Sequence, residues 1–175
     1  MRILITGVAG FIGGHLAEQL IQNGHEIIGI DNFDEFYSRR TKEKNLRELK
    51  QKNNFHFFEV DITKSDKLNE IFSQFSVDLV VHLAAKAGVR PSLNHPNEYL
   101  KANVEGTLNL LEAMRKKEIN KLIFASSSSV YGNSQQVPFR EENPLKDAIS
   151  VYAATKQCCE NLTRMYFNLY HIDTI

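Results

Sequence analysis

The sequence predicts a doubly wound α/β fold, in which helices cover both faces of a parallel sheet. Short apolar runs alternate with helical patterns from the beginning of the chain to its end. Most of these runs are apolar at consecutive positions, which is typical of strands buried on both faces and therefore of parallel sheets. Right-handed crossovers between such strands place helices on both sides of the sheet. The length of 175 residues suits one domain.

We expect six strands whose carboxyl ends share one edge of the sheet. They are predicted at residues 3–5, 26–30, 55–60, 78–83 and 121–125, with a sixth that begins at 173–175. Ligands of open parallel sheets lie outside the carboxyl ends of the strands. The loops of interest therefore follow Thr6, Ile30, Val60, Leu83 and Ala125.

Helices are predicted between these strands, at residues 11–22, 39–52, 65–75, 96–117 and 151–170. The first ends at Asn23-Gly24, which supplies a left-handed stop, and Ser65 is expected to cap the third. The second carries a run of charges that predicts a solvated face, made of Arg39, Arg40, Lys42 and Lys44. A loop is expected around Pro138, Asn143 and Pro144.

Two of the helices carry apolar stripes at helical spacing. We expect the stripe of the helix at 96–117 to be core by default; it consists of Leu100, Val104, Leu108 and Leu111. Cys158 is predicted to pack within the stripe of the last helix, beside Leu162, Met165 and Leu169.

Composition excludes several classes of protein. Lys and Arg number 21, as do Asp and Glu, and this neutral balance argues against an electrostatic nucleic-acid binder. The two cysteines, Cys158 and Cys159, are adjacent, which excludes a secreted disulfide framework. No apolar run approaches the roughly 20 residues of a membrane span, and the apolar run at the N-terminus is too short for a signal peptide. We expect a soluble, cytoplasmic protein.

A glycine-rich turn follows the first strand, with Gly7, Gly10 and Gly13 in G-x-x-G-x-x-G spacing. Small residues at a strand-to-helix turn let the backbone approach a pyrophosphate, whose charge meets N–H groups at the helix N-terminus. Asp31 ends the second strand 18 residues after Gly13, where a carboxylate accepts ribose hydroxyls and repels a 2′-phosphate. The pattern indicates an NAD site; the alternative is a glycine turn that only packs helix on strand. Asp61-Ile62 would suit the adenine edge, or form a simple Asx turn.

Tyr152 and Lys156 lie one helical turn apart on one face. A phenol with a pKa near 10 is a poor base at neutral pH, and a fixed cation nearby favours its phenolate. The serine run 126–129 ends the fifth strand, where a hydroxyl could bind the same substrate oxygen as Tyr152. The alternative is a surface Tyr-Lys pair beside an ordinary serine loop.

Together these motifs resemble the extended short-chain dehydrogenase/reductase family, and more narrowly its nucleotide-sugar 4-epimerases. The resemblance covers the whole chain and rests on T-G-V-A-G-F-I-G at 6–13, D-N at 31–32, D-I at 61–62, H-L-A-A at 82–85, Asn103, S-S-S-V-Y-G at 127–132 and Y-x-x-x-K at 152–156. The segments 31–37 and 87–92 are most similar to those of UDP-glucuronate 4-epimerases. This family binds NAD on a Rossmann fold.

The resemblance implies a role for each matching residue. In the family, Tyr152 would be the general base that removes the C4 hydroxyl proton while hydride passes to NAD, Lys156 would hold the nicotinamide ribose and lower the pKa of Tyr152, and Ser127 would bind the same oxygen. Rotation of the 4-keto sugar and return of the hydride would complete the inversion. The cofactor would contact Gly7, Gly10, Phe11, Ile12, Gly13, Asp31, Asn32, Asp61, Ile62, Leu83, Ala84, Ala85 and Ala87.

Ser128 and Ser129 distinguish branches of the family, because the 4,6-dehydratases carry Asp-Glu at these positions. Serines do not readily perform carboxylate proton transfer, so the sequence favours an epimerase. Arg90 could contact a sugar acid or a phosphate, or merely order its loop. His82 lies in an apolar strand and is expected to be a satisfied core histidine; without spaced Cys or His partners, no metal site is expected.

The resemblance also implies a homodimer built from the helices at 96–117 and 151–170. Relatives continue beyond the sixth strand into a smaller domain that grips the sugar nucleotide, so we expect residues 1–175 to be a Rossmann domain truncated at that strand, without the substrate domain. Three functions stay open: an epimerase of UDP-sugars, another sugar-nucleotide oxidoreductase such as a reductase, decarboxylase or dehydratase, and a non-catalytic NAD-binding module.

Overall fold

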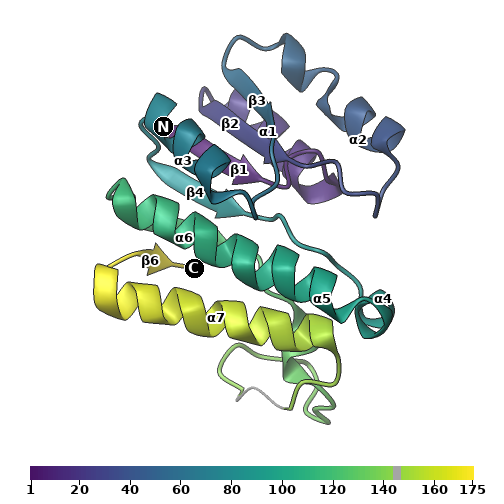
Figure 1. The fold of residues 1–175 in the computed structure, drawn as a ribbon. Helices are drawn as coiled ribbons and strands as arrows, with labels where there is room; N and C mark the ends of the chain where they lie inside the picture. The colour runs from purple at the N-terminus through teal and green to yellow at the C-terminus, as the bar shows by residue number, and fades with distance from the viewer. Residues whose placement is uncertain (144–146) are drawn as a thin grey trace.

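The computed structural model describes residues 1–143 and 147–175, which form a parallel sheet with helices on both faces (Figure 1). The sheet order is β3-β2-β1-β4-β5-β6. The strands are β1 (Arg2–Thr6), β2 (Glu26–Asp31), β3 (Phe55–Glu59), β4 (Leu79–His82), β5 (Lys121–Phe124) and β6 (Asp173–Thr174). From β1 the chain builds first toward β3 and then, from β4, toward β6. The predicted doubly wound fold is confirmed, and its switch point lies between β1 and β4.

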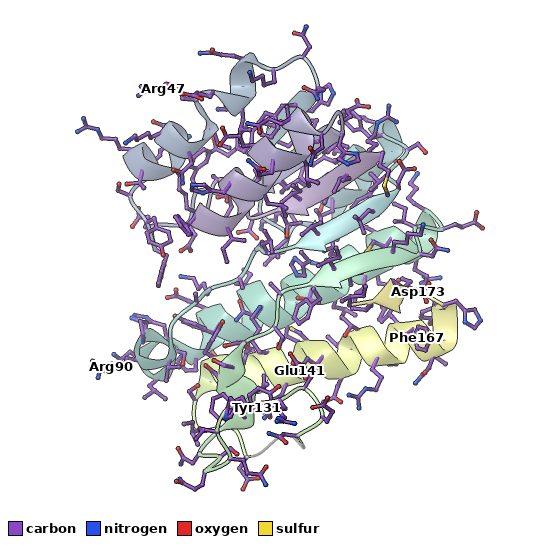
Figure 2. All side chains as sticks on the ribbon, turned by 180° about the vertical axis from the view of Figure 1, so that it is seen from behind. Arg47, Arg90, Tyr131, Glu141, Phe167 and Asp173 are labelled. Atoms are coloured by element: carbon purple, nitrogen blue, oxygen red, sulfur yellow. The ribbon has the colours of Figure 1, made fainter. Side chains whose placement is uncertain are left out.

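Two hydrophobic cores separate the sheet from its helices. One face carries α1 (Phe11–Gln22) and α2 (Arg39–Leu46) on its β3 side, with Ile123 of β5 40% exposed, and the other face is covered by α3 (Ser65–Gln74), α6 (Gly106–Lys116) and α7 (Val151–Tyr170). Figure 2, turned by 180° from Figure 1, looks onto the face that carries α1, with α1 in front of the strands. Leu4 of β1 lies in the α3–α6–α7 core, whereas Ile3 and Ile5 lie in the other. This alternation explains why β1 is apolar at consecutive positions.

Helix ends differ from the predictions in two places. The helix predicted at 39–52 ends at Leu46, and a separate 3₁₀ turn, Leu49–Gln51, follows; both leucines are buried against the α1 side of the sheet. Ser65 does not cap α3, because Lys64 occupies the N-cap and its carbonyl accepts from Leu68 N–H. The helix thus begins one residue earlier than a serine cap requires.

The helix predicted at 96–117 consists of three segments in succession. They are α5 (Pro96–Tyr99), a π-helical turn (Leu100–Glu105) and α6. Two short elements were not predicted, α4 (Val89–Asn94) and a 3₁₀ turn (Ser128–Tyr131). The predicted bounds of α7 are confirmed, and Ser150 Oγ caps it by accepting from Ala153 N–H at 3.0 Å. Pro144, in the predicted loop, lies outside the described residues.

The predicted apolar stripes lie only partly in the core, to which Leu111 and Leu162 contribute. Leu111 is buried, but Leu100 is 50% and Leu108 37% exposed. Cys158 is exposed, as are Met165 and Leu169, so the packing predicted for Cys158 is wrong. The reason is that α7 turns a different face inward, made of Ala153, Lys156, Cys159, Thr163 and Tyr166.

Within the described part of the chain, no helix combines the length and apolarity that crossing a bilayer requires.

Candidate functional site

A cavity of about 320 Å³ lies at the carboxyl ends of the strands, across the switch point of the sheet. Its lining residues come from the loops that the sequence singled out. They are Gly7, Gly10, Phe11, Ile12 and Gly13 after β1; Ile30, Asp31, Asn32, Asp34, Phe36, Tyr37 and Lys42 at and after the end of β2; Val60, Asp61 and Ile62 after β3; Leu83, Ala84, Ala85, Lys86 and Ala87 after β4; and Ala102 and Ala125. Every residue predicted to contact the cofactor is in this lining except Tyr152 and Lys156.

The glycine turn forms a cradle that side chains would fill. Gly7 has φ +73°, and a Cβ there would lie 2.8 Å from the backbone N of Ala84. A Cβ on Gly13 would lie 2.4 Å from the carbonyl O of Gly7. Gly10 is the N-cap of α1, whose first turn carries no acidic side chain. The cradle thus presents backbone and a helix N-terminus to the cavity, which fits a pyrophosphate.

Asp31 lies at the end of β2 and is held by three donors. Its carboxylate accepts from Ala9 N–H at 3.1 Å, from Phe33 N–H at 2.8 Å and from Lys42 Nζ at 3.0 Å. Lys42 is only 7% exposed, so its predicted place on a solvated face is wrong. The long side chain reaches inward because α2 packs its Lys42 and Leu46 positions toward the sheet.

Asp61 and Asn32 form a polar edge beside Asp31. Asn32 Nδ2 donates to Asp61 Oδ2 at 2.9 Å, and Asp61 Oδ1 accepts from Thr63 N–H at 2.8 Å. Burial by itself raises the pKa of Asp61, but the hydrogen bonds from Thr63 and Asn32 outweigh it and hold the pKa below its usual value. Asp61 therefore makes the Asx turn and also lines the cavity, so the two alternatives from the sequence are compatible.

Lys156 extends from α7 to the part of the cavity wall that Ala125 forms. It is 4% exposed, and its Nζ donates to the carbonyl O of Ala125, a lining residue, at 2.7 Å. Burial lowers the pKa of Lys156, because the charged form loses hydration. The ammonium is thus fixed where β5 meets the cavity.

Tyr152 is linked to the cavity through Tyr99. The two rings meet edge to face with centroids 6.3 Å apart, and Tyr99 Oη donates to the carbonyl O of Ala87 at 2.6 Å. Ala87 lines the cavity. The ring that carries the predicted base therefore packs on a residue that is itself tied to the cavity wall.

The serine run begins the 3₁₀ turn at the end of β5. Ser127 is its N-cap, and its Oγ accepts from Ser129 N–H at 3.2 Å. Gln157 of α7 donates to the carbonyl O of Val130 at 2.9 Å, which ties this turn to the helix that carries Tyr152. Ser127 and Ser129 are half-buried and Ser128 is exposed.

Asn103 and His82 make hydrogen bonds between the elements that surround the cavity. In the π-helical turn, Asn103 donates to Thr155 Oγ1 at 3.0 Å, and its Oδ1 accepts from Lys86 N–H at 2.7 Å. His82 is 1% exposed, with Nδ1 2.7 Å from Thr6 Oγ1 and Nε2 2.9 Å from Thr107 Oγ1. Burial, with a smaller effect of the Lys156 charge, lowers the pKa of His82 to about 3. The predicted core histidine is confirmed.

Arg90 lies apart from these residues. It is exposed on α4, and Figure 2 shows it at the outer margin of the fold. It is not in the lining of the cavity as described. The described residues contain no group of three or more His, Cys, Asp or Glu side chains that could hold a metal ion.

Sequence reasoning assigned no cofactor contact to nine residues of the lining, namely Ile30, Asp34, Phe36, Tyr37, Lys42, Val60, Lys86, Ala102 and Ala125. Lys86 bridges Asp34 and Glu98 at 3.1 and 2.8 Å, which ties the loop after β2 to α5. One signal was available for Lys42: it precedes the buried Leu46 by four residues, so both lie on one helix face.

A family model described as GDP-mannose 4,6 dehydratase matches residues 4–175. Among curated proteins, a UDP-glucuronate 4-epimerase of Thermodesulfobacterium geofontis is 45% identical over 170 residues, covering 97% of this chain and 52% of the relative. Protein CapI of Staphylococcus aureus is 44% identical, covering 99% of this chain and 52% of the relative. The chain spans about half the length of the curated relatives it matches.

Solved structures agree in fold. A UDP-glucuronic acid 4-epimerase from Bacillus cereus, in complex with UDP-glucuronic acid and NAD, has TM-score 0.92 and 36% identity, covering all of this chain and 55% of that one. A UDP-glucose 4-epimerase from Thermus thermophilus in complex with NAD has TM-score 0.87 and 34% identity, covering 99% and 53%. The sequence resemblance is thus confirmed: the chain belongs to the extended short-chain dehydrogenase/reductase family, in the group whose model is described as GDP-mannose 4,6 dehydratase.

Proposed function

We propose that residues 1–175 form the NAD-binding half of a UDP-sugar 4-epimerase, with UDP-glucuronate as the substrate. The observation that carries the proposal is one cavity that is lined by a glycine cradle and Asp31 and that reaches Ala125, whose carbonyl O accepts a hydrogen bond from the buried Lys156 ammonium. The similarity to UDP-glucuronate 4-epimerases supports the choice of substrate. Because the relatives are about twice as long, the contacts to the sugar nucleotide would come largely from a further domain.

In this proposal the adenosine end is built from Asp31, Asn32, Asp61 and Ile62, and the pyrophosphate lies over Gly7, Gly10 and Gly13. The chain's own backbone N–H groups supply the positive end of α1 to the phosphates. The glycine cradle and the carboxylates of Asp31 and Asp61 in the cavity lining fit such a dinucleotide. When bound, NAD would supply a reversible hydride acceptor.

The proton chemistry falls to three side chains. Tyr152 takes the proton of the sugar C4 hydroxyl, and Ser127 Oγ binds the same oxygen. Lys156, held by Ala125 O, lies one helical turn from Tyr152 on α7 and can donate to a ribose hydroxyl. After the 4-keto sugar has rotated, Tyr152 returns the proton and the C4 configuration is inverted, with no net redox change.

Ser128 and Ser129 favour epimerisation over dehydration, although the matching family model is named for a dehydratase. Elimination of water across C5 and C6 needs an acid and a base beside the catalytic hydroxyl. Serine hydroxyls do not titrate near neutral pH, so these two positions would leave the 4-keto sugar to be reduced again.

A homodimer through the helices at 96–117 and 151–170 belongs to the same proposal. The exposed apolar side chains of these helices support it, because such a patch marks an interaction surface. They include Leu100, Leu108, Met165 and Leu169. We further propose a reducing, cytoplasmic setting, in keeping with the free thiols of Cys158 and Cys159.

The decisive experiment uses the longest gene product that contains these residues. It is incubated with UDP-glucuronate and NAD, and the C4 epimers are resolved by chromatography. We expect conversion to the C4 epimer, reduced by about 10³-fold in Tyr152→Phe, which is the loss expected for a general base. NAD binding without conversion of any UDP-sugar would support a non-catalytic module. A 4-keto-6-deoxy product would instead identify a dehydratase.

A further inference from the structure

The adenosine end of the cavity contains a buried ion pair. Lys42 Nζ lies 3.0 Å from Asp31 Oδ1, and the exposed fractions of the two side chains are 9% and 4%. Both residues line the cavity. They come from different elements, since Asp31 ends β2 and Lys42 lies on α2. An ammonium therefore stands beside the carboxylate that the sequence assigned to the ribose.

Counting donors and acceptors shows what this pair still offers. A carboxylate has about four acceptor positions, and three are taken by Ala9 N–H, Phe33 N–H and Lys42. An ammonium has three donors, and one is given to Asp31. The pair thus retains acceptor and donor capacity side by side, which matches a vicinal diol, because each hydroxyl both donates and accepts.

The other charged groups near this ion pair add no unpaired positive charge to the site. Asp61 lies on the same polar edge. Arg39, also on α2, is paired with Glu59 at 2.8 Å and with Glu43 at 3.0 Å. With Asp31 ionised, the charge of Lys42 is offset, so the site has no net cation to offer a 2′-phosphate.

We propose that Lys42 is a specificity-determining residue, a latent 2′-phosphate site that Asp31 neutralises. The proposal rests on the proposed dinucleotide site. In the intact pair, Lys42 donates to a ribose hydroxyl while Asp31 accepts from the other. Without the carboxylate charge, the same ammonium becomes a partner for a phosphate dianion, and a single substitution turns an NAD site toward NADP.

The test measures the affinities of NAD and NADP by calorimetry, with ADP-ribose and its 2′-phosphate as probes that lack the nicotinamide. Asp31→Asn keeps an oxygen acceptor and removes the charge. We expect the ratio of the NADP to the NAD dissociation constant to fall by about 100-fold. The reason is that the Lys42 ammonium, no longer offset by a carboxylate, attracts the 2′-phosphate at close range in a partly buried site. The 2′-phosphorylated probe should show the same shift.

Lys42 is tested directly in two backgrounds. In Asp31→Asn/Lys42→Met the gain in NADP affinity should vanish, whereas Asp31→Asn/Lys44→Met, which removes an exposed lysine of the same helix, should retain it. Lys42→Met alone should move the ratio the other way, by about tenfold, because an unpaired carboxylate repels the phosphate. This second variant keeps the proposal testable should Asp31→Asn not fold.

The outcomes separate this proposal from the proposed function. An unchanged ratio in folded Asp31→Asn, or a shift that persists without Lys42, would overturn the role of Lys42 while the NAD site stands. A wild-type protein that binds neither dinucleotide nor ADP-ribose would overturn the proposed function itself, and the role of Lys42 with it.

Discussion

The two ends of the cavity are built by different means. At the glycine end the shape comes from backbone in close approach, because Cβ atoms on Gly7 or Gly13 would lie within 3 Å of other backbone atoms. At the end near α7 the shape comes from side-chain hydrogen bonds, such as Lys156 to Ala125 O and Tyr99 to Ala87 O. A backbone cradle is lost when side chains are added, whereas a side-chain scaffold is lost when groups are removed.

Substitutions at the two ends should therefore affect function and stability differently. Substitutions in the glycine cradle should act on folding and binding together, since the same backbone atoms serve both. Substitutions at the α7 end should act on chemistry first, because each side chain can be shortened without moving the backbone.

Lys156→Met should break the α7 end with little change in stability. The substitution removes the ammonium that we propose assists the proton transfer at Tyr152, and we expect kcat in the longest gene product to fall by about 10³-fold, or about 4 kcal/mol. Methionine fills similar space and spares a buried charge, so the free energy of unfolding should change by less than about 1 kcal/mol. Lys117→Met, at an exposed position, is the control. Activity retained in Lys156→Met would refute the assigned role.

Gly13→Ala should break the glycine end through sterics. The new Cβ would lie 2.4 Å from Gly7 O and 2.8 Å from Val8 Cα, so backbone must shift. We expect the free energy of unfolding to fall by about 3 kcal/mol, measured by urea denaturation. The neighbouring Gly14 is the matched control, since its Cβ would meet Asn45 Cβ at an ordinary 3.5 Å. Gly14→Ala should be neutral or stabilise by up to about 1 kcal/mol. Equal effects at the two positions would contradict the cradle.

The sequence could predict the glycine end because its determinants are local. Gly7, Gly10 and Gly13 follow one strand directly, and Asp31 ends the next strand, so a strand-by-strand interpretation places them at one edge. The bounds of α7 were also predicted, although most of its apolar stripe faces outward, and Ser150 would have been a further local signal for the start of the helix.

The remaining features depend on contacts between distant segments. Lys42 looked like a solvated charge because nothing near it in the sequence indicates that Asp31 is its partner. Cys158 and Cys159 are neighbours on one helix, and only the packing of α7 on α6 decides that Cys159 is buried. The π-helical turn at Asn103 likewise serves bonds to Thr155 and Lys86, which lie 52 and 17 residues away.

His82 is buried between Thr6 of β1 and Thr107 of α6 and should make stability depend on pH. Its pKa is about 3 in the folded protein, against 6.5 for the free side chain. Between these values the unfolded chain binds a proton that the folded one does not, so stability rises with pH and is lost as pH falls below 6.5. The slope is about 1.4 kcal/mol per pH unit, or about 2 kcal/mol by pH 5.

Urea denaturation at pH 7 and pH 5 measures this effect. In His82→Gln the loss of stability between the two pH values should be smaller by that amount, whereas in His95→Gln, at an exposed position, it should persist. The carboxyls whose pKa is lowered in the folded protein are Glu26, Glu59, Asp61, Glu98 and Glu112; their ordinary pKa values are 4.5 or lower, so they change the stability little between pH 7 and pH 5. An unaltered slope in His82→Gln would show that other groups carry it.

Tyr99→Phe is the smallest change at the α7 end, because it deletes one hydroxyl and keeps the ring. The carbonyl O of Ala87 loses a donor at 2.6 Å, which should cost about 1 kcal/mol of stability in urea denaturation. The edge-to-face contact with Tyr152 remains, so kcat should fall far less than in Lys156→Met. Tyr99→Leu removes the ring contact as well and should lower kcat further at similar KM. If Tyr99→Phe and Tyr99→Leu lower kcat equally, the hydroxyl rather than the ring positions Tyr152, and the α7 end depends on the cavity wall more than on aromatic packing.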